Sequence, residues 1–449
     1  MFAKVLIANR GEIALRIIRA CHELGVEAVA VFSEADRDSL HVRFADEAVC
    51  IGPPSVAESY LNIPRIIAAA EITGADAIHP GYGLLAENAE FSEICDASGI
   101  TFVGPTADQI RAMGDKVVAR ETMMEIGVPT VPGSEGALNS VREALRLADG
   151  IAYPVMVKAA AGGGGKGMRI ARDAGELERV FGSTRMEAQA AFGDSSVYLE
   201  KLIERPRHVE IQVFGDSHGR VVHLGERDCS VQRRHQKLIE EAPAYGLSPE
   251  LREEMGRAAV RGAAGIEYAG AGTVEFLLDP SGAFYFIEMN TRIQVEHPVT
   301  EVTTGLDLVK EQIRVAFGAP LSFPPEPASH RGHAIEFRIN AEDPERDFMP
   351  APGTIDVFHP PAGPGIRLDT HVYAGYTVPR YYDSLLAKVI VSAATRREAI
   401  DRARHSLDNF VVGGVPTTLS FLLRILRDRR FVEGAVDTSL VDRLMSEAA

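Results

Sequence analysis

Two glutamates fall opposite each other in a predicted β-hairpin. Residues 272–278 and 283–288 have the composition of strands, and the residues between them favour a turn. A two-residue turn at Ser281-Gly282, or a symmetric four-residue loop, places Glu275 directly opposite Glu288. Facing carboxylates repel, so this pairing is more favourable with a divalent cation between them. Oxygen ligands without histidine or cysteine favour Mg²⁺ or Mn²⁺ over Zn²⁺.

Polar residues continue in alternation after this hairpin. If the chain stays extended, five polar side chains share one face, namely Glu288, Asn290, Arg292, Gln294 and Glu296. They offer a further oxygen ligand, a guanidinium that can bind a planar anion, an amide and a base. A half-buried strand with one wet side is the alternative explanation. The neighbouring carboxylate pair favours the functional one.

A glycine-rich loop has the composition of a phosphate lid. A strand that ends at Lys158 is followed by the glycines 162–165, by Lys166 and by a return strand. Backbone N–H groups without nearby Cβ atoms can close over phosphate oxygens, and the two lysines add positive charge. The loop is not a Walker motif, since Ala160 stands at the position of its first glycine and Gly167 follows the lysine. A flexible surface hairpin is the alternative.

Alternating strands and helices in the first hundred residues predict a parallel sheet. We expect strands at residues 4–9, 28–32, 75–79 and 100–103, and helices at 12–24, 63–72 and 86–97. This alternation is typical of a Rossmann-like sheet with helices on both faces. The turn after the first strand, Asn9-Arg10-Gly11-Glu12, has one glycine where a dinucleotide site needs three. The motif therefore argues against dinucleotide binding.

The remaining chain mixes helices with mostly antiparallel strands. Thr106 is a candidate N-cap of a helix that reaches about residue 126, and the glycine- and proline-rich segment 127–133 then breaks the chain. We expect residues 152–213 to form a compact insert of a strand, the glycine loop, another strand, two helical segments and two further strands. The later expected elements are antiparallel strands within 221–301 around a helix at 249–266, a proline-rich stretch at 320–327, strands at 334–339 and 387–391, and helices at 396–409 and 417–426.

The composition is that of a soluble globular protein with about three folding units. The 449 residues are 46% hydrophobic and 24% charged, and the net charge is −16. Such a charge repels nucleic acid and anionic lipid, so a phosphate-bearing ligand needs a locally basic pocket. No run of 18 apolar residues is present, and the four cysteines form no CxxC pair. We therefore expect a cytoplasmic protein with reduced thiols and neither nucleic acid nor a membrane as partner.

Longer runs of residues resemble the ATP-grasp ligases and, within them, the biotin carboxylases. These runs are 79–88 (HPGYGLLAEN), 233–237 (RRHQK), 288–298 (EMNTRIQVEHP), 338–342 (RINAE) and 381–384 (YYDS). The resemblance covers nearly the whole chain and implies an α/β and α+β fold. The implied domains are a Rossmann-like parallel-sheet domain at 1–113, an ATP-grasp core at 114–330 with a mobile glycine-rich lid subdomain at about 131–204, and a mixed C-terminal domain at 331–449.

The resemblance also implies which residues meet each substrate. The positions that match nucleotide contacts are Lys116, Lys158, Gly164, Gly165, Glu200, Lys201, Leu202, Ile203, His208 and His235, and the matching metal ligands are Glu275, Glu288 and Asn290. The matching bicarbonate pocket consists of Lys237, Arg292, Gln294 and Val295. Glu296 matches the base, Arg338 the group that meets the biotin ureido oxygen, and Tyr82 a position near biotin. Lys237, Arg292, Glu296 and Arg338 are thus the expected catalytic residues.

The implied activity is that of a C–N bond-forming ligase that carboxylates biotin with ATP and bicarbonate. Glu296 would deprotonate bicarbonate, which attacks the γ-phosphate of ATP to give carboxyphosphate and ADP. Carboxyphosphate would break down to CO₂ and phosphate, and biotin would trap the CO₂ on nitrogen. The expected metal is Mg²⁺ or Mn²⁺, with two ions bound.

The expected partners follow from what the chain does not contain. No Met-Lys-Met sequence of the kind that accepts biotin is present, so biotin would be carried on a separate biotin carboxyl carrier protein. Carboxyltransferase subunits would complete the complex, with acetyl-CoA as the expected acceptor and fatty-acid synthesis as the expected role. A homodimer is also implied, although Pro364 stands at an aromatic dimer-contact position of some relatives. The alternatives are another ATP-grasp carboxylate-amine ligase, or a subunit that serves propionyl-CoA, pyruvate or 2-oxoglutarate.

Overall fold

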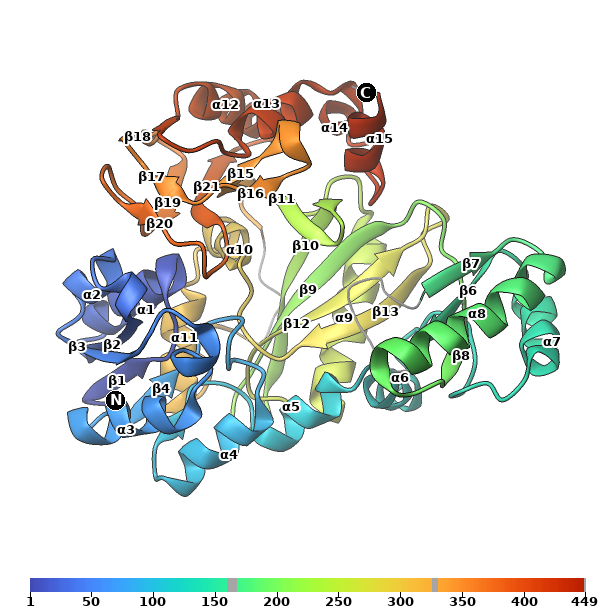
Figure 1. Ribbon diagram of the computed structural model, residues 1–449, viewed down its shortest axis with the longest axis horizontal. Coiled ribbons are helices and arrows are strands. Elements are labelled where there is room, and N and C mark those ends of the chain that lie inside the picture. The colour runs from blue at the N-terminus through green and yellow to red at the C-terminus, as the bar shows by residue number, and fades with distance from the viewer. Residues whose placement is uncertain (160–167, 325–329, 448–449) are drawn as a thin grey trace.

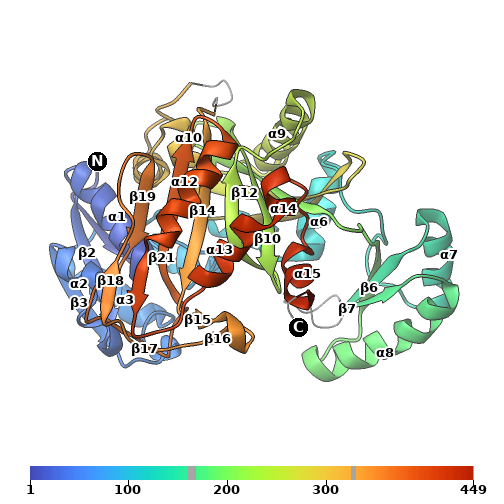
Figure 2. The ribbon, with the colours of Figure 1, turned by 90° about the horizontal axis from the view of Figure 1, so that it is seen from above.

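The structure is a computed structural model that describes residues 1–159, 168–324 and 330–447. Figure 1 shows three parts of the molecule, which are an N-terminal sheet with its helices (blue), a large central sheet, and a small lobe (green). The lobe and the N-terminal sheet lie at opposite ends of the molecule in both ribbon views (Figure 2). The C-terminal helices lie against the central sheet.

The N-terminal sheet is parallel, with the strand order β3-β2-β1-β4-β5. Its strands are β1 (Lys4–Ile7), β2 (Glu27–Ser33), β3 (Glu47–Gly52), β4 (Ala77–His79) and β5 (Thr101–Phe102). Its helices are α1 (Gly11–Glu23), α2 (Leu40–Phe44), α3 (Ile63–Thr73) and α4 (Ala89–Ala97). Alternating residues of β1 enter two cores, since Leu6 packs with α3 and α4 whereas Ile7 packs with α1 and with α11 (Leu308–Ala316). The predicted parallel sheet with helices on both faces is confirmed.

The central sheet has eight antiparallel strands in the order β13-β12-β9-β10-β11-β14-β21-β19. The strands are β9 (Arg207–Gly215), β10 (Val221–Arg233), β11 (Gln236–Ala242), β12 (Gly270–Leu278), β13 (Phe284–Asn290), β14 (His333–Asn340), β19 (Ile366–Thr370) and β21 (Leu385–Ala393). Because β11 pairs with β14, one continuous sheet joins residues before 330 to residues after it.

The two faces of the central sheet differ in character. One face is apolar and is covered by α6 (Lys116–Glu125) and α9 (Pro249–Gly265) at one end, and at the other by α12 (Arg396–Asp408), α13 (Leu419–Arg427), α14 (Arg429–Glu433) and α15 (Leu440–Ser446). On the opposite face α10 (His297–Thr304) places Val299 against Ala242, Ala334 and Ile390. The strands carry Glu210, Arg227, Glu240 and Glu336 on this second face, beside α10, whereas the buried Glu241 lies on the apolar face.

The small lobe is a three-stranded sheet with two helices. Its elements are α7 (Val141–Ile151), β6 (Val155–Ala159), β7 (Met168–Ala171), α8 (Ala174–Phe192) and β8 (Val197–Lys201), with the strand order β7-β6-β8. The prediction of two helical segments is wrong here, since α8 is one continuous helix. Gly182 lies inside it, and the loss of about 1 kcal/mol that a helical glycine causes is offset by burial of Leu177, Phe181 and Ala188. The predicted glycine loop, with Gly164, Gly165 and Lys166, lies outside the described residues.

The helix expected from Thr106 to residue 126 is two helices. Thr106 caps α5 (Ala107–Gly114) as predicted, through a capping box with Gln109. The helix is interrupted at Asp115, because the Oδ1 of this residue accepts hydrogen bonds from the backbone N–H groups of Val117 (2.8 Å) and Val118 (3.1 Å). An aspartate that caps the next turn starts a new helix, which is α6.

Shorter elements complete the C-terminal part. They are β15 (Glu342–Asp343), β16 (Met349–Pro350), β17 (Gly353–Thr354), β18 (Val357–His359), β20 (Thr377–Val378) and β22 (Val411–Gly413). The predicted strands at 334–339 and 387–391 and the predicted helices at 396–409 and 417–426 are confirmed as β14, β21, α12 and α13. Within the described ranges, none of the helices combines the length and the apolar character needed to cross a membrane.

Candidate active site

The predicted pairing of Glu275 with Glu288 is confirmed, but its geometric basis differs from the prediction. The turn has three residues, 280–282, and closes through a bond from the Asp279 N–H to the Ala283 carbonyl (2.7 Å). Gly282 has φ +96°, as such a turn requires. The turn sets Phe276 opposite Phe286, and one extra residue in β13 then brings Glu288 opposite Glu275. A β-bulge therefore restores the register that a two-residue turn would have given.

The polar stripe after the hairpin is not an extended strand. β13 ends at Asn290 and α10 begins at His297, so the segment between them turns instead of alternating. Its side chains converge all the same. The amides of Asn290 and Gln294 both donate to Glu275 Oε1, at 2.9 and 2.8 Å, and Arg292 Nη2 donates to Asn290 Oδ1 at 2.9 Å. Glu275 is thus the common acceptor of this segment.

Lys237 lies at the centre of the site. Its Nζ donates to Glu210 Oε2 (2.6 Å), Glu275 Oε1 (3.0 Å) and Glu296 Oε1 (2.6 Å). Burial opposes the lysine charge, but these carboxylates raise the pKa of Lys237 well above its usual value. Burial also opposes ionisation of Glu296, yet Lys237, Arg338 and Arg227 lower the pKa of Glu296 well below its usual value. The site therefore holds fixed opposite charges away from bulk water.

Arg338 contacts the other oxygen of Glu296. Its Nη2 lies 3.0 Å from Glu296 Oε2, and its Nε donates to Glu240 Oε1 at 2.6 Å. Tyr82 reaches the same region from the N-terminal part, where its hydroxyl donates to Glu12 Oε1 at 2.5 Å. Burial raises the pKa of Tyr82, and the nearby charge of Arg338 opposes that shift. The structure thus brings Arg338, Glu296 and Tyr82 into one neighbourhood.

The expected nucleotide residues fall into two groups. Lys116, at the start of α6, binds Glu288 Oε2 at 2.9 Å and so lies at the hairpin. Lys158 and Glu200 bind each other across β6 and β8 in the small lobe. His208 Nε2 is 3.0 Å from Glu275 Oε2, which places it beside the first group.

Other expected residues are placed without a polar contact to the site. Lys201 Nζ donates to the backbone carbonyls of Ala152 (3.1 Å) and Tyr153 (2.9 Å). The Leu202 N–H donates to the Pro154 carbonyl at 3.0 Å, and Ile203 is buried. His235 is exposed at the tip of the β10–β11 hairpin. Val295 lies between the site residues Gln294 and Glu296, and its carbonyl accepts a hydrogen bond from Lys388 Nζ (2.7 Å). Gly164 and Gly165 lie outside the described residues.

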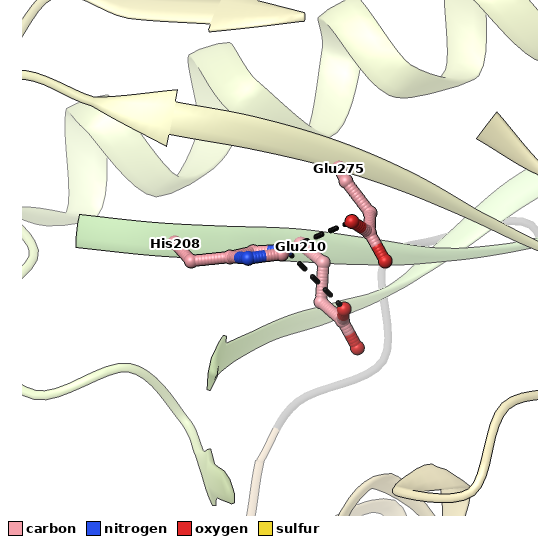
Figure 3. A group of neighbouring side chains, drawn as sticks. All are labelled: His208, Glu210 and Glu275. Atoms are coloured by element: carbon pink, nitrogen blue, oxygen red, sulfur yellow. Dashed lines mark ion pairs between the residues drawn. The ribbon is translucent and has the colours of Figure 1, made fainter. Parts of the chain in front are cut away.

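Two different sets of residues could hold a cation at this site. His208, Glu210 and Glu275 lie close enough to share one cation, with His208 Nε2 4.0 Å from Glu210 Oε2 (Figure 3). The set expected from the sequence is Glu275, Glu288 and Asn290, and β12 and β13 place these three residues at neighbouring positions of one hairpin. This set offers oxygen ligands, which Mg²⁺ and Mn²⁺ prefer. In the structure Lys116 and Lys237 occupy the two carboxylates in place of a cation.

Sequence reasoning missed three site residues, Glu210, Arg227 and Glu87. Arg227 is fully buried and donates to Glu210 Oε1 (2.5 Å) and Gln294 Oε1 (3.1 Å). Glu87 accepts from Arg292 Nε at 2.7 Å. The signal for Glu210 was present in the sequence, because β9 alternates polar with apolar residues in a strand that is buried on both faces. The local sequence did not indicate which residues of other strands the polar side chains of β9 contact.

Comparison with known proteins gives consistent matches along the whole chain. Three family models match in succession, namely biotin carboxylase, N-terminal domain (residues 1–110), carbamoyl-phosphate synthase L chain, ATP binding domain (115–323) and biotin carboxylase C-terminal domain (336–443). The chain is 58% identical over 443 residues to a biotin carboxylase of Nostoc sp., with 99% of each chain covered.

Solved structures agree with these matches. A biotin carboxylase from Campylobacter jejuni, solved as a β,γ-ATP complex, is 49% identical with a TM-score of 0.93 and 99% coverage of both chains. The biotin carboxylase domain dimer of the Hydrogenobacter thermophilus 2-oxoglutarate carboxylase, solved with MgADP, ADP and bicarbonate, is 51% identical with a TM-score of 0.91. That match covers 99% of this chain and 98% of the other.

Proposed function

Since the chain belongs to the biotin carboxylase family of ATP-grasp ligases, we propose that it carboxylates biotin on a carrier protein, with ATP and bicarbonate as co-substrates. The observation that carries this proposal is the Lys237–Glu296–Arg338 cluster beside the paired carboxylates Glu275 and Glu288. It combines an ionised base, two cations for anionic substrates and a metal-binding hairpin on one face of a sheet. The products are ADP, phosphate and carboxybiotin.

Bicarbonate occupies the region between Lys237 and Arg292. Arg292 can hold a planar oxyanion with two parallel hydrogen bonds, and Lys237 adds a point charge, with Gln294 and the backbone of Val295 completing the pocket. Glu296 accepts the proton of bicarbonate. Its two ion partners hold it ionised before substrates bind, and anionic substrates that draw Lys237 and Arg338 away from it increase its basicity. Carboxyphosphate then forms from the deprotonated bicarbonate and the γ-phosphate of ATP.

Glu275, Glu288 and Asn290 hold the metal ions in this proposal. Mg²⁺ or Mn²⁺ at these oxygens would neutralise charge on the triphosphate. Lys116 is released from Glu288 to bind phosphate, and His208 stays against Glu275. The MgADP complex of the Hydrogenobacter thermophilus domain supports magnesium as the ion.

The nucleotide lies between the central sheet and the small lobe. Lys158, Glu200, Lys201, Leu202, Ile203 and His235 are the contacts we assign to it, together with Gly164 and Gly165 of the lid. The proposed domains are a Rossmann-like domain at 1–113, an ATP-grasp domain at 114–330 with a lid at about 131–204, and a C-terminal domain at 331–449. Closure of the lid excludes water, which would hydrolyse carboxyphosphate.

Biotin binds at Arg338 and Tyr82. Carboxyphosphate breaks down to CO₂ and phosphate, and biotin loses its ureido proton to that phosphate. Arg338 stabilises the resulting negative oxygen, and the ureido nitrogen then attacks CO₂. Biotin arrives on a biotin carboxyl carrier protein, and carboxyltransferase subunits use the product. Acetyl-CoA is the acceptor we propose, in a cytoplasmic homodimer, although the Hydrogenobacter thermophilus relative belongs to a 2-oxoglutarate carboxylase.

The direct test is ADP formation with Mg²⁺ and bicarbonate, measured with and without free biotin. Labelled bicarbonate should appear in an acid-labile product whose formation requires biotin. Bicarbonate-dependent ADP formation that ignores both biotin and a biotinylated carrier would contradict the acceptor and favour another ATP-grasp carboxylate-amine ligase. Absence of any bicarbonate-dependent ADP formation would contradict the whole assignment.

A further inference from the structure

Two buried glutamates face each other beside Arg338, which binds one of them. Glu240 of β11 pairs in register with Glu336 of β14, and both side chains are fully buried. Directly opposed residues of antiparallel strands have their Cβ atoms about 4.5–5.5 Å apart. Two ionised carboxylates at that separation, away from water, repel strongly. The pair therefore requires either compensating cations or a proton.

The available cations do not satisfy both carboxyl groups. Arg338 binds Oε1 of Glu240, while Lys388 Nζ is hydrogen-bonded to the Val295 carbonyl (2.7 Å) and lies 3.0 Å from Glu12 Oε1. In the described parts of the chain, Oε2 of Glu240 and both oxygens of Glu336 have no hydrogen-bond partner. A buried acceptor without a donor is costly, and a proton on one carboxyl group supplies the missing donor to the other.

Charged and titratable groups surround the pair on every side. Facing it are Cys229 from β10, Lys237 from β11, Arg338 from β14, Lys388 from β21, and Glu296 directly before α10. Burial raises the pKa of Glu240 to about 7, with Glu296 adding to the shift and Arg338 opposing it. Burial also raises the pKa of Glu336 well above its usual value, and Glu240 adds to that shift against Lys388.

We propose, on the basis of the function proposed above, that Glu240 and Glu336 hold one proton between them and act as positioning residues for Arg338. Glu336 donates its O–H to the free oxygen of Glu240, and the single remaining charge on Glu240 orients the guanidinium. Loss of that proton adds a second negative charge next to Arg338 and Glu296. Bicarbonate and the ureido oxygen bring negative charge of their own there, so biotin-dependent turnover falls at alkaline pH.

The test compares the pH dependence of biotin-dependent kcat/KM in wild type and Glu336→Gln. Glutamine donates an N–H to Glu240 and cannot lose the proton, so the alkaline limb should move to higher pH by about one unit or more. Glu226→Gln is the control, because Glu226 is also fully buried and has an oxygen without a partner in the described chain, but its other oxygen is bound to Arg252 Nε at 2.6 Å. Its alkaline limb should coincide with that of wild type. An unmoved limb in Glu336→Gln, or an equal shift in Glu226→Gln, overturns the proposal.

Two further measurements keep the proposal testable if Glu336→Gln does not fold. Infrared spectra of wild type at about pH 8, where exposed carboxylates are ionised, should retain a protonated carboxyl C=O band that shifts in D₂O, and its absence overturns the pair. Glu240→Gln should lower biotin-dependent kcat by about tenfold or more through loss of orientation, while KM for ATP stays unchanged. An unchanged kcat overturns the positioning role.

These outcomes are distinct from failure of the proposed function. A wild-type protein that forms no ADP in response to biotin contradicts the function itself, and the infrared band then still decides whether the pair is protonated. An active wild type whose alkaline limb is insensitive to Glu336→Gln contradicts the pair alone.

Discussion

Arg338 and Lys237 bind different oxygens of the same carboxylate, Glu296, and the proposed function assigns them to different steps. Lys237 also binds Glu210 and Glu275, on the side where we propose that bicarbonate and phosphate bind. Arg338 binds Glu240 and Glu296 and lies on the side of Tyr82. Removing each cation should therefore affect a different half of the reaction.

Arg338→Ala should lower biotin-dependent carboxylation by about 10²-fold or more, because the negative ureido oxygen loses its stabilising group. Bicarbonate-dependent ADP formation without biotin should remain substantial, since Lys237 still compensates Glu296. Both rates can be measured in one coupled ADP assay. Loss of ATP binding in this variant would remove Arg338 from the biotin side. Arg338→Lys is a useful comparison, because it keeps the charge and loses the planar fork.

Glu288→Gln should mainly raise the Mn²⁺ or Mg²⁺ concentration needed for half-maximal ADP formation. The variant removes the charge of one of the two carboxylates that face each other across the hairpin, and Lys116 loses its ion-pair partner. Asp279→Asn makes the same change of charge at the turn of the same hairpin and should leave the metal dependence unchanged. Normal metal dependence of Glu288→Gln would contradict the assignment of Glu288 as a ligand.

At the scale of elements, a single carboxylate joins two strands and a helix on the apolar face of the central sheet. Glu241 of β11 accepts two hydrogen bonds from Arg396 of α12, at 2.6 and 2.8 Å, and a third contact of 2.8 Å from His333 of β14. Burial opposes ionisation of Glu241, but these partners lower its pKa to about 2. Glu240 and Glu241 are adjacent in sequence, and their opposite faces give them opposite pKa shifts.

Glu241→Gln should reduce the free energy of unfolding by about 3–5 kcal/mol, because it leaves the buried guanidinium of Arg396 without its counter-charge. The wild-type contribution is present above pH 4.5, the usual pKa of a glutamate, and is lost as the pH falls toward 2. Urea unfolding at neutral pH measures the loss, with the exposed Glu345→Gln as the control. A loss no larger than in that control would contradict the role of the ion pair.

At the scale of the whole molecule, buried neutral histidines oppose folding in acid. Burial lowers the pKa of His41 to about 4 and the pKa of both His79 and His371 to about 3, from a usual value of 6.5. Between pH 6.5 and 4 the unfolded chain binds protons that the folded protein does not, so stability falls as the pH falls. Glu240 and Glu336 act in the opposite sense, since their raised pKa values make the folded protein bind extra protons.

The histidines should prevail, so the urea midpoint should decrease as the pH falls from about 6.5 to 4.5. His41→Gln should make this decrease smaller, because burial lowers the pKa of His41 in the folded protein and glutamine takes up no proton in either state. His359→Gln, at an exposed position, should leave the slope unchanged. A midpoint that rises over this pH range would contradict the dominance of the histidines.

Local sequence determined the elements that position the site and the chemistry they carry. The period of two in strands such as β12 and β13 fixes which residues share a face, and glycine with proline marks the turn, so the pairing of Glu275 with Glu288 was predictable. Capping residues such as Thr106 fixed helix starts. The predicted register was reached through a three-residue turn and a bulge instead, because turn length and bulges depend on packing against neighbouring strands.

Tertiary structure alone decided which charges of separate segments meet. Lys237, Glu210 and Glu296 come from three separate segments, and Glu240 meets Glu336 only because β11 pairs with a strand more than ninety residues later in one register. A shift of that register by one residue would turn Glu336 to the apolar face. Sequence patterns record the side of a strand on which a residue lies. Outside a hairpin they do not record its partner across the sheet, because that contact is fixed by the burial of all eight strands together.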